Sequence, residues 1–509
     1  MRVCHMQKSP LTTEEMRVIE LNANLLGITH SMLMQNAGRE VARVVAQNER
    51  VDGKRIAILC GLGGNGGDGF VAARYLQEDG AAVEVYLLGS ENDITNRDAS
   101  LNWDILKNLH EIKKQVLKTE SSVKACKAIL EADILIDAMM GFGLKSRLRE
   151  PMLSAVKAFN RSDAKKYSVD VPTGLDSDTG AVLGTAVATD VTIALHAPKK
   201  GLMSAREQIG KLVVVSIGIP AEAIRLCGPG DLSLYTEARK ATAHKGDFGR
   251  ILVVGGSNVY SGAPALAGMA ALRTGADLVS VLVPESVVNA VRSYSPNLMV
   301  SSLGTEILLQ ENVETILGES KNQDVIALGP GLGLDSETVS AVRTVSGKLG
   351  SSGKRMVIDA DGLKALAGSE IRFTSENVVL TPHWGELAIL LEEKLNDSPE
   401  LQDRIEASLR ASAQYDSVIL LKGPVDVVAR PDGFFKLNRT GVPAMTVGGT
   451  GDVLTGIVAT LLARGKGAFF AATSGAYVCG RAGELAFNDL GDHITPTDCI
   501  GKIPEAMRK

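Results

Sequence analysis

Short apolar runs alternate with helix-like stretches along most of the chain. A run that is apolar at nearly every position is typical of a strand buried on both faces of a parallel sheet. Alternation of such strands with helices predicts a parallel α/β sheet. In the first half the strand-like runs are Arg55–Cys60, Ala82–Leu88, Asp133–Ala138, Lys166–Val171, Val191–Leu195 and Leu212–Ile217, and the helix-like stretches between them are Phe70–Glu78, Asp98–Leu109, Ser122–Leu130 and Pro151–Asn160.

The second half shows the same alternation of apolar strands and helix-like stretches. Residues 11–50, ahead of the first strand, are predicted to be helical, with a threonine cap before Glu14 and Glu15. The Gly- and Pro-containing segment Leu226–Asp231 is the best linker candidate. We therefore expect a Rossmann-like doubly wound domain over residues 1–227 and a second α/β domain over 236–509. The second set of runs is Arg250–Val254, Leu278–Pro284, Val325–Leu328, Arg355–Ile358, Val378–Leu380 and Ser417–Leu421.

Composition narrows the class of protein. The 509 residues include 53 glycines but only 17 prolines, which suggests tight turns and close approach of backbone to ligand. The net charge of −5 argues against a broad nucleic-acid footprint. No apolar run reaches the ~18–20 residues that cross a bilayer, and the N-terminus lacks the apolar core of a secretory signal. Six scattered cysteines show no zinc spacing, as is typical of the cytoplasm.

A glycine-rich segment follows the first strand. Gly61, Gly63 and Gly66 satisfy G-x-G-x-x-G between that strand and a helix predicted to begin near Phe70. Such glycines let backbone N–H groups approach a phosphate, although a tight turn without a ligand also needs glycine. A dinucleotide dehydrogenase places an acid at the end of its second strand. That strand ends Tyr86–Ser90 without one, which disfavours hydride transfer.

Polar residues stand at the ends of several predicted strands. Because the carboxyl ends of parallel strands line one crevice, we expect Asn65, Asp68, Asp137, Asp170 and Thr173 to meet there. Their oxygens suit a hard cation, and a carboxylate in a crevice can serve as an acid–base catalyst. Each also has a structural alternative, with Asp68 as a helix cap, Asp137 as a loop anchor and Asp170 as a turn former.

The second domain contains a sharper motif. Gly448–Gly451 leads directly into the apolar stretch Asp452–Leu462, so free N–H groups at a helix N-terminus would bind an anion. Asp452 beside that anion hole can take a proton from a hydroxyl that attacks phosphorus. The alternative is a partner for the helix dipole. His383, after a strand and Thr-Pro, is either a ligand contact or a buried histidine. No Walker A loop occurs.

These motifs resemble known families. The second half resembles the ribokinase-like family, whose Gly-x-Gly-Asp motif matches Gly449–Asp452. Both halves together are similar to the bifunctional NAD(P)H-hydrate repair enzymes, over nearly the whole chain. The residues that carry this resemblance are Gly64–Gly69, Asp170–Gly174, Tyr260–Pro264, Gly329–Gly333, Thr381–His383 and Gly449–Asp452.

The resemblance implies two activities in one cytoplasmic, homo-oligomeric protein. The first domain would interconvert the R and S forms of hydrated NADH and NADPH, with potassium held by Asn65, Asp137 and Thr173. The second would dehydrate the S form at the expense of ADP, with Mg²⁺. Asp452 and Asp170 would be catalytic. The hydrate would contact Gly64, Asn65, Gly66, Gly67, Asp68, Gly141, Phe142, Gly143, Leu144, Lys145, Ser146, Arg147, Ala263, Gly331, Gly333 and His383, and ADP would contact Lys422, Gly423, Pro424, Val425, Asp426 and Gly451.

Four positions depart from the usual motifs of the family. Thr173 stands in place of a serine, Gly64 in place of a frequent asparagine, and Trp384 in place of a proline. Asp426 stands where the family often has a threonine, and an acid beside a nucleotide phosphate is unfavourable. Two other functions compete with nucleotide repair. A ribokinase-like small-molecule kinase fused to a Rossmann-like domain would release a stable phosphorylated product. A non-catalytic nucleotide-binding protein would not need Asp452 at its anion hole.

Overall fold

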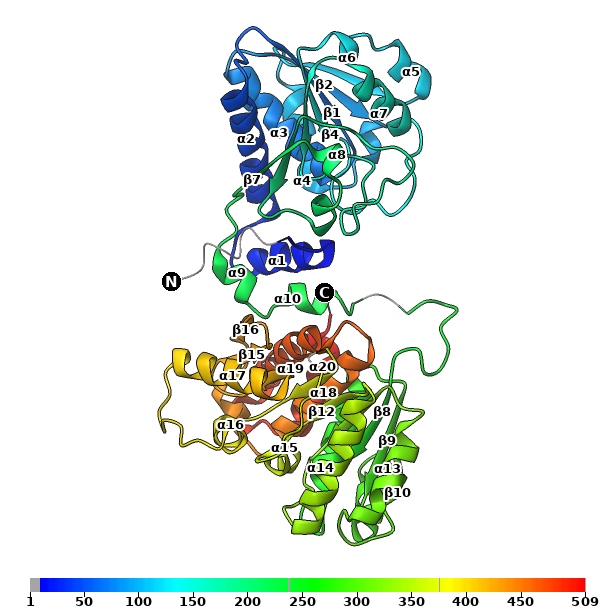
Figure 1. Ribbon diagram of the computed structural model, residues 1–509, viewed down its shortest axis with the longest axis vertical. Coiled ribbons are helices and arrows are strands. Elements are labelled where there is room, and N and C mark those ends of the chain that lie inside the picture. Colours follow the sequence, from blue (N-terminus) through cyan, green and yellow to red (C-terminus); the bar gives the residue numbers. More distant parts are fainter. Residues whose placement is uncertain (1–9, 237–238, 375, 509) are drawn as a thin grey trace. The chain divides into compact units, whose positions relative to one another are not determined.

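The computed structural model describes residues 10–236, 239–374 and 376–508. The chain forms two compact units, residues 1–223 and residues 224–509. Figure 1 shows the two units, and each is described here by itself. Both are layered α/β structures, so the predicted fold class, with a parallel sheet in each half, is confirmed.

The first unit contains a seven-stranded parallel sheet in the order β3-β2-β1-β4-β5-β6-β7. This is the doubly wound order, in which the chain reverses direction across the sheet between β1 and β4. Four of the strands are buried along all or nearly all of their length, because helices cover both faces. The strands are β1 (Arg55–Cys60), β2 (Ala82–Leu88), β3 (Lys113–Leu117), β4 (Ile134–Ala138), β5 (Lys165–Val169), β6 (Val191–Leu195) and β7 (Lys211–Val215).

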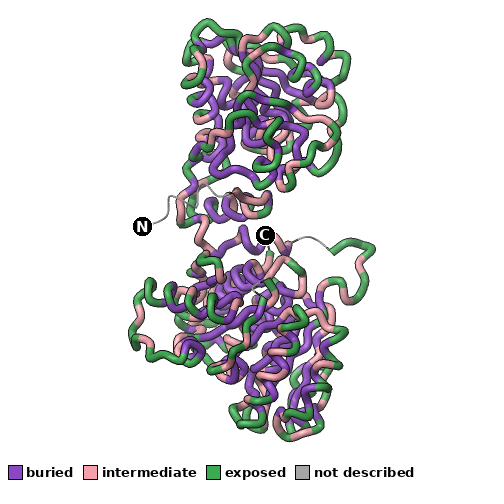
Figure 2. The backbone as a smooth tube through the Cα atoms, viewed as in Figure 1, coloured by how far each residue is buried: buried purple, intermediate pink, exposed green. Residues whose placement is uncertain are grey.

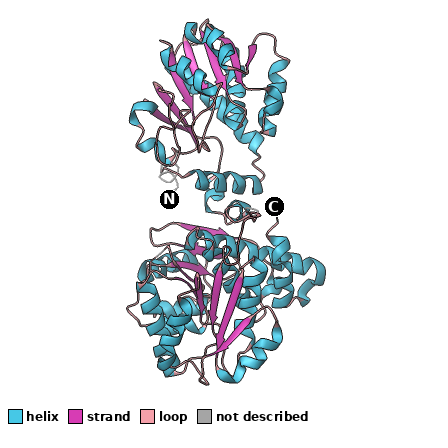
Figure 3. Cartoon of the chain, turned by 90° about the vertical axis from the view of Figure 1, so that its right-hand side faces the viewer, coloured by secondary structure: helices cyan, strands magenta, loops and turns pink. Residues whose placement is uncertain are grey.

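The helices of the first unit connect these strands and flank the sheet (Figure 3). Leu11 pairs with Lys199 after β6, and this short bridge fixes the start of α1 against the sheet. The helices are α1 (Thr13–Leu25), α2 (His30–Asn48), α3 (Gly64–Glu78), α4 (Arg97–Lys107), α5 (Glu120–Ala125), α6 (Ala128–Glu131), α7 (Met152–Arg161), α8 (Arg206–Ile209) and α9 (Ala221–Arg225).

The second unit contains a nine-stranded sheet in the order β10-β9-β8-β11-β12-β13-β14-β15-β16. The strands β8 to β14 are parallel, whereas β15 and β16 add an antiparallel hairpin at one edge. Strand order reverses between β8 and β11. The strands are β8 (Arg250–Val254), β9 (Leu278–Val283), β10 (Met299–Ser302), β11 (Val325–Leu328), β12 (Arg355–Ile358), β13 (Val378–Leu380), β14 (Val418–Leu421), β15 (Asp426–Ala429) and β16 (Phe435–Asn438).

The helices of the second unit again lie on both faces of the sheet. No helix within the described residues has the length and apolar content needed to span a membrane. The helices are α10 (Pro229–Ser233), α11 (Gly262–Thr274), α12 (Val288–Tyr294), α13 (Val313–Ser320), α14 (Ser336–Ser351), α15 (Asp361–Leu366), α16 (Trp384–Leu391), α17 (Leu401–Tyr415), α18 (Thr450–Ala463), α19 (Ala468–Leu490) and α20 (Pro496–Ala506).

The strands form the centre of each core (Figure 2). In the second unit, apolar residues of β8 and β11 alternate between two clusters, one on each face of the sheet. This alternation explains why these strands appear as continuous apolar runs in the sequence. Cys60, Cys126, Cys227, Cys479 and Cys499 are free thiols, and Cys4 lies outside the described residues.

The glycine-rich segment differs from its prediction. Helix α3 begins at Gly64, not near Phe70, so these glycines belong to the helix itself. A Cβ at Gly66 would lie 2.0 Å from the carbonyl oxygen of Gly61, and one at Gly67 would lie 2.6 Å from the Met34 sulfur. Close packing of the first turns of α3 on β1 and α2 therefore requires glycine at these positions.

The predicted linker Leu226–Asp231 is not an unstructured connection between the two units. Pro229–Ser233 is a helix, α10, and Asp231 is fully buried. Its carboxylate forms an ion pair of 2.7 Å with the buried Lys436 of β16. The glycine and proline here start a helix that packs on the second unit, with proline at its first turn.

Two helical glycines of the second unit test how tightly its core is packed. A Cβ at Gly456 in α18 would lie 2.0 Å from the carbonyl oxygen of Ala267 in α11. We predict that Gly456→Ala lowers the free energy of unfolding of this unit by about 1–3 kcal/mol. Gly347→Ala in α14 is the control, since no atom lies within 4 Å of its added Cβ.

In thermal unfolding, Gly347→Ala raises the midpoint, because alanine is about 1 kcal/mol better than glycine inside a helix. Equal midpoints for the two variants would contradict the close α11–α18 contact.

Candidate active sites

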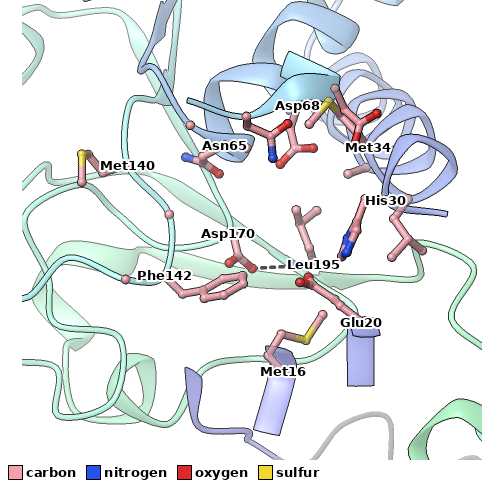
Figure 4. A pocket seen from close by; sticks show the side chains of 18 of the residues that line it. Met16, Glu20, His30, Met34, Asn65, Asp68, Met140, Phe142, Asp170 and Leu195 are labelled. Atoms are coloured by element: carbon pink, nitrogen blue, oxygen red, sulfur yellow. Dashed lines mark hydrogen bonds between the residues drawn. The ribbon is translucent and has the colours of Figure 1, made fainter. Parts of the chain in front are cut away.

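A cavity of about 850 Å³ lies at the carboxyl ends of the strands of the first unit (Figure 4). The segments after β1, β4, β5 and β6 form its floor, and α1, α2 and α4 supply residues to its walls. The cavity therefore lies where the strand order reverses, which is the usual ligand site of a doubly wound sheet.

The first turns of α3 supply part of the predicted site. Gly64, Asn65 and Asp68 line the cavity, whereas Gly66 and Gly67 pack away from it. Asp68 lies inside α3, and the N-cap is Gly63, so the alternative of a capping aspartate is wrong. Burial, with Asp170 and Glu20 nearby, raises the pKa of the Asp68 carboxyl well above its ordinary value.

Asp170 follows β5 with a φ of 64°, in the left-handed region that an aspartate seldom adopts. This conformation accompanies a buried ion pair between its Oδ1 and the Nζ of Lys199. The same oxygen also accepts from the backbone N–H of Leu195 at 3.1 Å. A strained residue held by an ion pair in a cavity points to function.

Glu20, on α1, faces the same cavity. Burial raises the pKa of its carboxyl to about 7; Lys199 lowers the pKa and Asp170 raises it. In Figure 4, Asp170 is drawn between Asp68 and Glu20. The cavity therefore holds three carboxyl groups and one buried lysine, which cannot all be charged at low energetic cost.

Asp137 and Thr173, two of the residues predicted to hold potassium, are in direct contact. The Asp137 carboxylate is fully buried and accepts from the Oγ1 of Thr173 at 2.7 Å and from its backbone N–H at 2.8 Å. Burial raises the pKa of Asp137 to about 6, despite these hydrogen bonds. Thr173 also donates to the carbonyl of Met140 at 3.2 Å. Asp137 therefore also anchors the loop that contains Thr173, which is the structural role that the sequence offered as an alternative to cation binding.

Asn65 lies close to this cluster. Its Oδ1 is the nearest atom, at 3.2 Å, to a Cβ built on Gly141, which follows Met140. Its buried Nδ2 has no hydrogen-bond partner among the described residues. An unsatisfied buried N–H group indicates a missing hydrogen-bond acceptor, and not a missing cation. The amide, hydroxyl, carboxylate and carbonyl oxygens here are the donors that a hard cation prefers.

Only part of the loop predicted to contact the hydrate reaches the cavity. Gly141, Phe142 and Gly143 line it, whereas Leu144 is buried in the unit. The other three residues do not line it. Lys145 pairs with Asp178 at 3.3 Å, Ser146 is exposed, and Arg147 extends along Gly184.

The second site is centred on the N-terminus of α18. Gly449 caps this helix with a φ of 102°, which glycine adopts without strain. Asp452 stands in the first turn. Burial raises the pKa of its carboxyl to about 7, Asp359 raises it further and Lys422 opposes both. This position at the helix N-terminus is compatible with both roles expected from the sequence, an acid–base catalyst and a partner of the helix dipole.

Lys422 connects three strand ends around this helix. Its Nζ donates to the Oδ1 of Asp359 at 2.8 Å and lies 3.8 Å from the Oε2 of Glu386. The other Asp359 oxygen accepts from Thr455 of α18 at 2.7 Å. A Cβ on Gly451 would lie 3.3 Å from the same Nζ, so a side chain here would crowd the lysine.

The residues predicted to bind the hydrate in this unit also lie at strand ends. Gly331 packs against Ala263, since its Cβ would lie 3.3 Å from the Cβ of that alanine. The N–H of Gly333 donates to Asp361 at 2.9 Å, and Asp361 is among the groups that raise the pKa of Asp452.

His383 is exposed and caps α16 through Nδ1, which accepts from Gly385 and Glu386. The alternative of a buried histidine is therefore wrong.

Asp426 does not extend freely from its loop. Its carboxylate accepts from the N–H of Gly423 at 2.9 Å and from the amide of Asn438 at 2.9 Å. Burial raises its pKa to about 6. The acid therefore closes the turn made by Gly423, Pro424 and Val425.

Both halves of the chain match known families. Residues 30–201 match the model of the YjeF-related protein N-terminus, and residues 251–505 match that of NAD(P)H-hydrate dehydratase. A bifunctional NAD(P)H-hydrate repair enzyme of Pyrobaculum aerophilum is 42% identical over 98% of both chains. Its counterpart in Methanopyrus kandleri is 41% identical over 98% of this chain and 96% of its own.

The chain belongs to the family of bifunctional NAD(P)H-hydrate repair enzymes. The predicted family is therefore confirmed. A solved ADP/ATP-dependent NAD(P)H-hydrate dehydratase of Bacillus subtilis is 27% identical, with a TM-score of 0.47, over 56% of this chain and 98% of its own.

Sequence reasoning missed several members of both sites in this repair-family chain. Glu20 comes from a helix outside the strand–helix alternation, and no sequence signal marks it. Lys199 and Asp359 follow strands that were predicted, so the rule that found Asp170 also applies to them. Glu386 stands three residues after His383 and was not assigned a role.

The ion pair of Asp170 and Lys199 gives a direct test of this site. Lys199→Met leaves an uncompensated buried carboxylate, so we predict a loss of about 3–5 kcal/mol in the unfolding free energy of the first unit. The double variant with Asp170→Asn recovers part of the loss. Lys200→Met is the matched control, since its exposed pair with Glu15 at 3.8 Å stabilises by less than about 1 kcal/mol.

Urea unfolding of the full chain measures these differences. A Lys199→Met variant as stable as Lys200→Met would contradict the assignment.

Proposed function

We propose that the chain repairs hydrated NADH and NADPH. The first unit interconverts the R and S hydrates, and the second dehydrates the S form to NAD(P)H at the expense of ADP. The observation that supports this most strongly is Asp452, a carboxyl with a pKa of about 7 at a glycine-capped helix N-terminus. Family membership over nearly the full chain supports both activities together.

In the dehydratase, Asp452 acts as the general base. The hydroxyl on the hydrated ring is a poor leaving group, and Asp452 takes its proton as the oxygen attacks the terminal phosphorus of ADP. AMP leaves as the new O–P bond forms. The C–O bond of the resulting phosphate ester then breaks to release inorganic phosphate, and loss of the proton on the neighbouring ring carbon restores the double bond. The first N–H groups of α18 have no partners within the helix, so they stabilise charge on the transferring phosphate.

Lys422 and the turn after it form the nucleotide side of the site. The Lys422 ammonium lies beside Gly451, where it can pair with phosphate oxygens. The Asp426 carboxylate is hydrogen-bonded within this turn, to Gly423 and Asn438, instead of facing the nucleotide. This removes the electrostatic repulsion expected between an acid and a phosphate.

Mg²⁺ fits here as a companion of the nucleotide. The described residues include no group of three or more His, Cys, Asp or Glu that could hold a metal ion. Mg²⁺ would therefore take most ligands from phosphates and water, which is its usual habit, with Asp359 or Glu386 completing the set. It would neutralise charge on the phosphates.

In the epimerase, Asp170 and the potassium site flank the hydrate. Asp170 contributes a fixed negative charge beside the reacting carbon, held by Lys199. Potassium would be held by Asn65, Asp137 and Thr173, where it would offset the charge of a buried carboxylate. The cytoplasmic location and the homo-oligomer predicted from the sequence stay predictions.

The potassium site has a readout that does not depend on activity. We predict that KCl, compared with choline chloride at equal ionic strength, raises the thermal midpoint of the first unit. Thr173→Val removes one oxygen donor from the site and abolishes the difference between the two salts. An equal rise in the wild type and the variant would show that potassium does not bind there.

Asp452→Asn separates the two activities. Loss of a general base costs about 10²–10⁴-fold in rate, so dehydration of the S hydrate with ADP falls by that factor, while epimerisation is unchanged. For the wild type, kcat/KM for dehydration rises with pH up to about 7 and is then flat, because the base must be ionised. Asp492→Asn, at an exposed position of the same unit, is the control.

The same variant has an effect on stability. The pKa of Asp452 is raised by folding, so its native state binds protons more tightly and is destabilised as pH rises from about 4 to about 7. Asp452→Asn therefore raises the thermal midpoint of the second unit at pH 8 but not at pH 4. For the activity, near-normal dehydration of the S hydrate by Asp452→Asn would overturn the assignment of Asp452 as the general base.

A further inference from the structure

The first cavity contains two carboxyl groups that the proposed function has not used as acids. Asp68 comes from α3 and Glu20 from α1, so they reach the cavity from different elements of the unit. In Figure 4, Asp68 is drawn near Asn65 and Glu20 near Leu195, with Asp170 between them. A ring bound beside Asp170 would therefore be flanked by carboxyl groups from two different helices.

The two carboxyl groups differ from ordinary surface acids. Asp170, beside them, forms a buried ion pair with Lys199. Burial raises the pKa of Asp68 well above normal and that of Glu20 to about 7. A raised pKa favours the acid form of Asp68, and Glu20 can exchange a proton near neutral pH, which is how two carboxyl groups in one site divide acid and base roles.

The geometry points to Glu20 and Asp68 as the acid–base pair of the epimerase, acting on opposite faces of the hydrated nicotinamide ring. This inference rests on the proposed epimerase function and assigns the residues that perform it.

The reaction balances as an elimination and readdition of water. Protonated Asp68 gives its proton to the ring hydroxyl, and the C–O bond breaks with its electron pair leaving in a water molecule. The lone pair of the ring nitrogen forms a C=N double bond, and the cation is stabilised by the carboxylate of Asp170. Water then adds to the other face and gives a proton to Glu20, and the nitrogen regains its pair. Proton exchange with solvent then returns Asp68 to its acid form and Glu20 to its base form. The reverse direction exchanges the two roles.

Burial, together with the charged and titratable groups near the pair, sets its pH dependence. The groups that line the same cavity are Arg17 on α1, His30 on α2, Arg97 and Asp98 on α4, and Lys199 and Asp170 at the strand ends. Of these, Lys199 and Arg17 favour the ionised form of Glu20, and Asp170 disfavours it. The rate of epimerisation therefore follows the ionisation of Glu20 near pH 7.

The test uses the full chain, pure R hydrate of NADH, no ADP and water enriched in ¹⁸O. Wild type is expected to place one ¹⁸O in each S hydrate formed, faster than in the enzyme-free reaction. Glu20→Gln and Asp68→Asn are each expected to lower kcat for epimerisation by about 10²–10⁴-fold with little change in KM. Glu20→Gln also loses the pH dependence near 7, whereas His30→Gln keeps it.

Two controls accompany the variants. Both variants keep a cooperative thermal unfolding transition of the first unit, which shows that this unit is folded, and Glu78→Gln, at an exposed position of α3, epimerises normally. If wild type fails to epimerise, the proposed function is wrong. If wild type epimerises but Glu20→Gln stays within about threefold of it, or if the product retains ¹⁶O, the acid–base pair is wrong.

Discussion

The reversal of strand order in each parallel sheet is the constraint on which both sites depend. Between β1 and β4, and again between β8 and β11, neighbouring strands send their connections to opposite faces. The carboxyl ends of the strands therefore open onto a space that no connection fills. Asp68, Asp170 and Lys199 reach one such space, and Asp359, Lys422 and Asp452 meet at the other.

Burial raises the pKa of carboxyl groups at these positions, so that they can exchange protons near neutral pH. A carboxyl group in water is ionised at neutral pH and is a weak base, whereas the pKa values of Glu20 and Asp452 are raised by burial to about 7. In each unit a lysine forms a direct ion pair with a neighbouring carboxylate, Asp170 or Asp359. Each site thereby combines a fixed negative charge with a group that can exchange a proton near pH 7.

Most strands of the two sheets, and some of the residues of the two sites, could be predicted from the sequence. Fully buried strands such as Arg250–Val254 and Val325–Leu328 were placed at their observed bounds, because continuous apolar runs are distinctive. The short or less apolar strands β3, β10, β15 and β16 were not predicted. Asp170 at a strand end and Asp452 at a helix N-terminus could be identified, whereas Glu20 could not, since only tertiary packing brings α1 over the cavity. The contacts of Asp426 could not be predicted, because its partner Asn438 belongs to a hairpin that the sequence pattern does not show.

The central claim is that one chain recovers both hydrates. The decisive measurement incubates the full chain with an equal mixture of R and S hydrated NADH and follows the absorbance of reduced nicotinamide, with and without ADP. The account predicts complete recovery with ADP, faster than the spontaneous interconversion of the two forms, and none without it. Recovery that stops at the S half would contradict the epimerase, and no recovery with ADP would contradict the account as a whole.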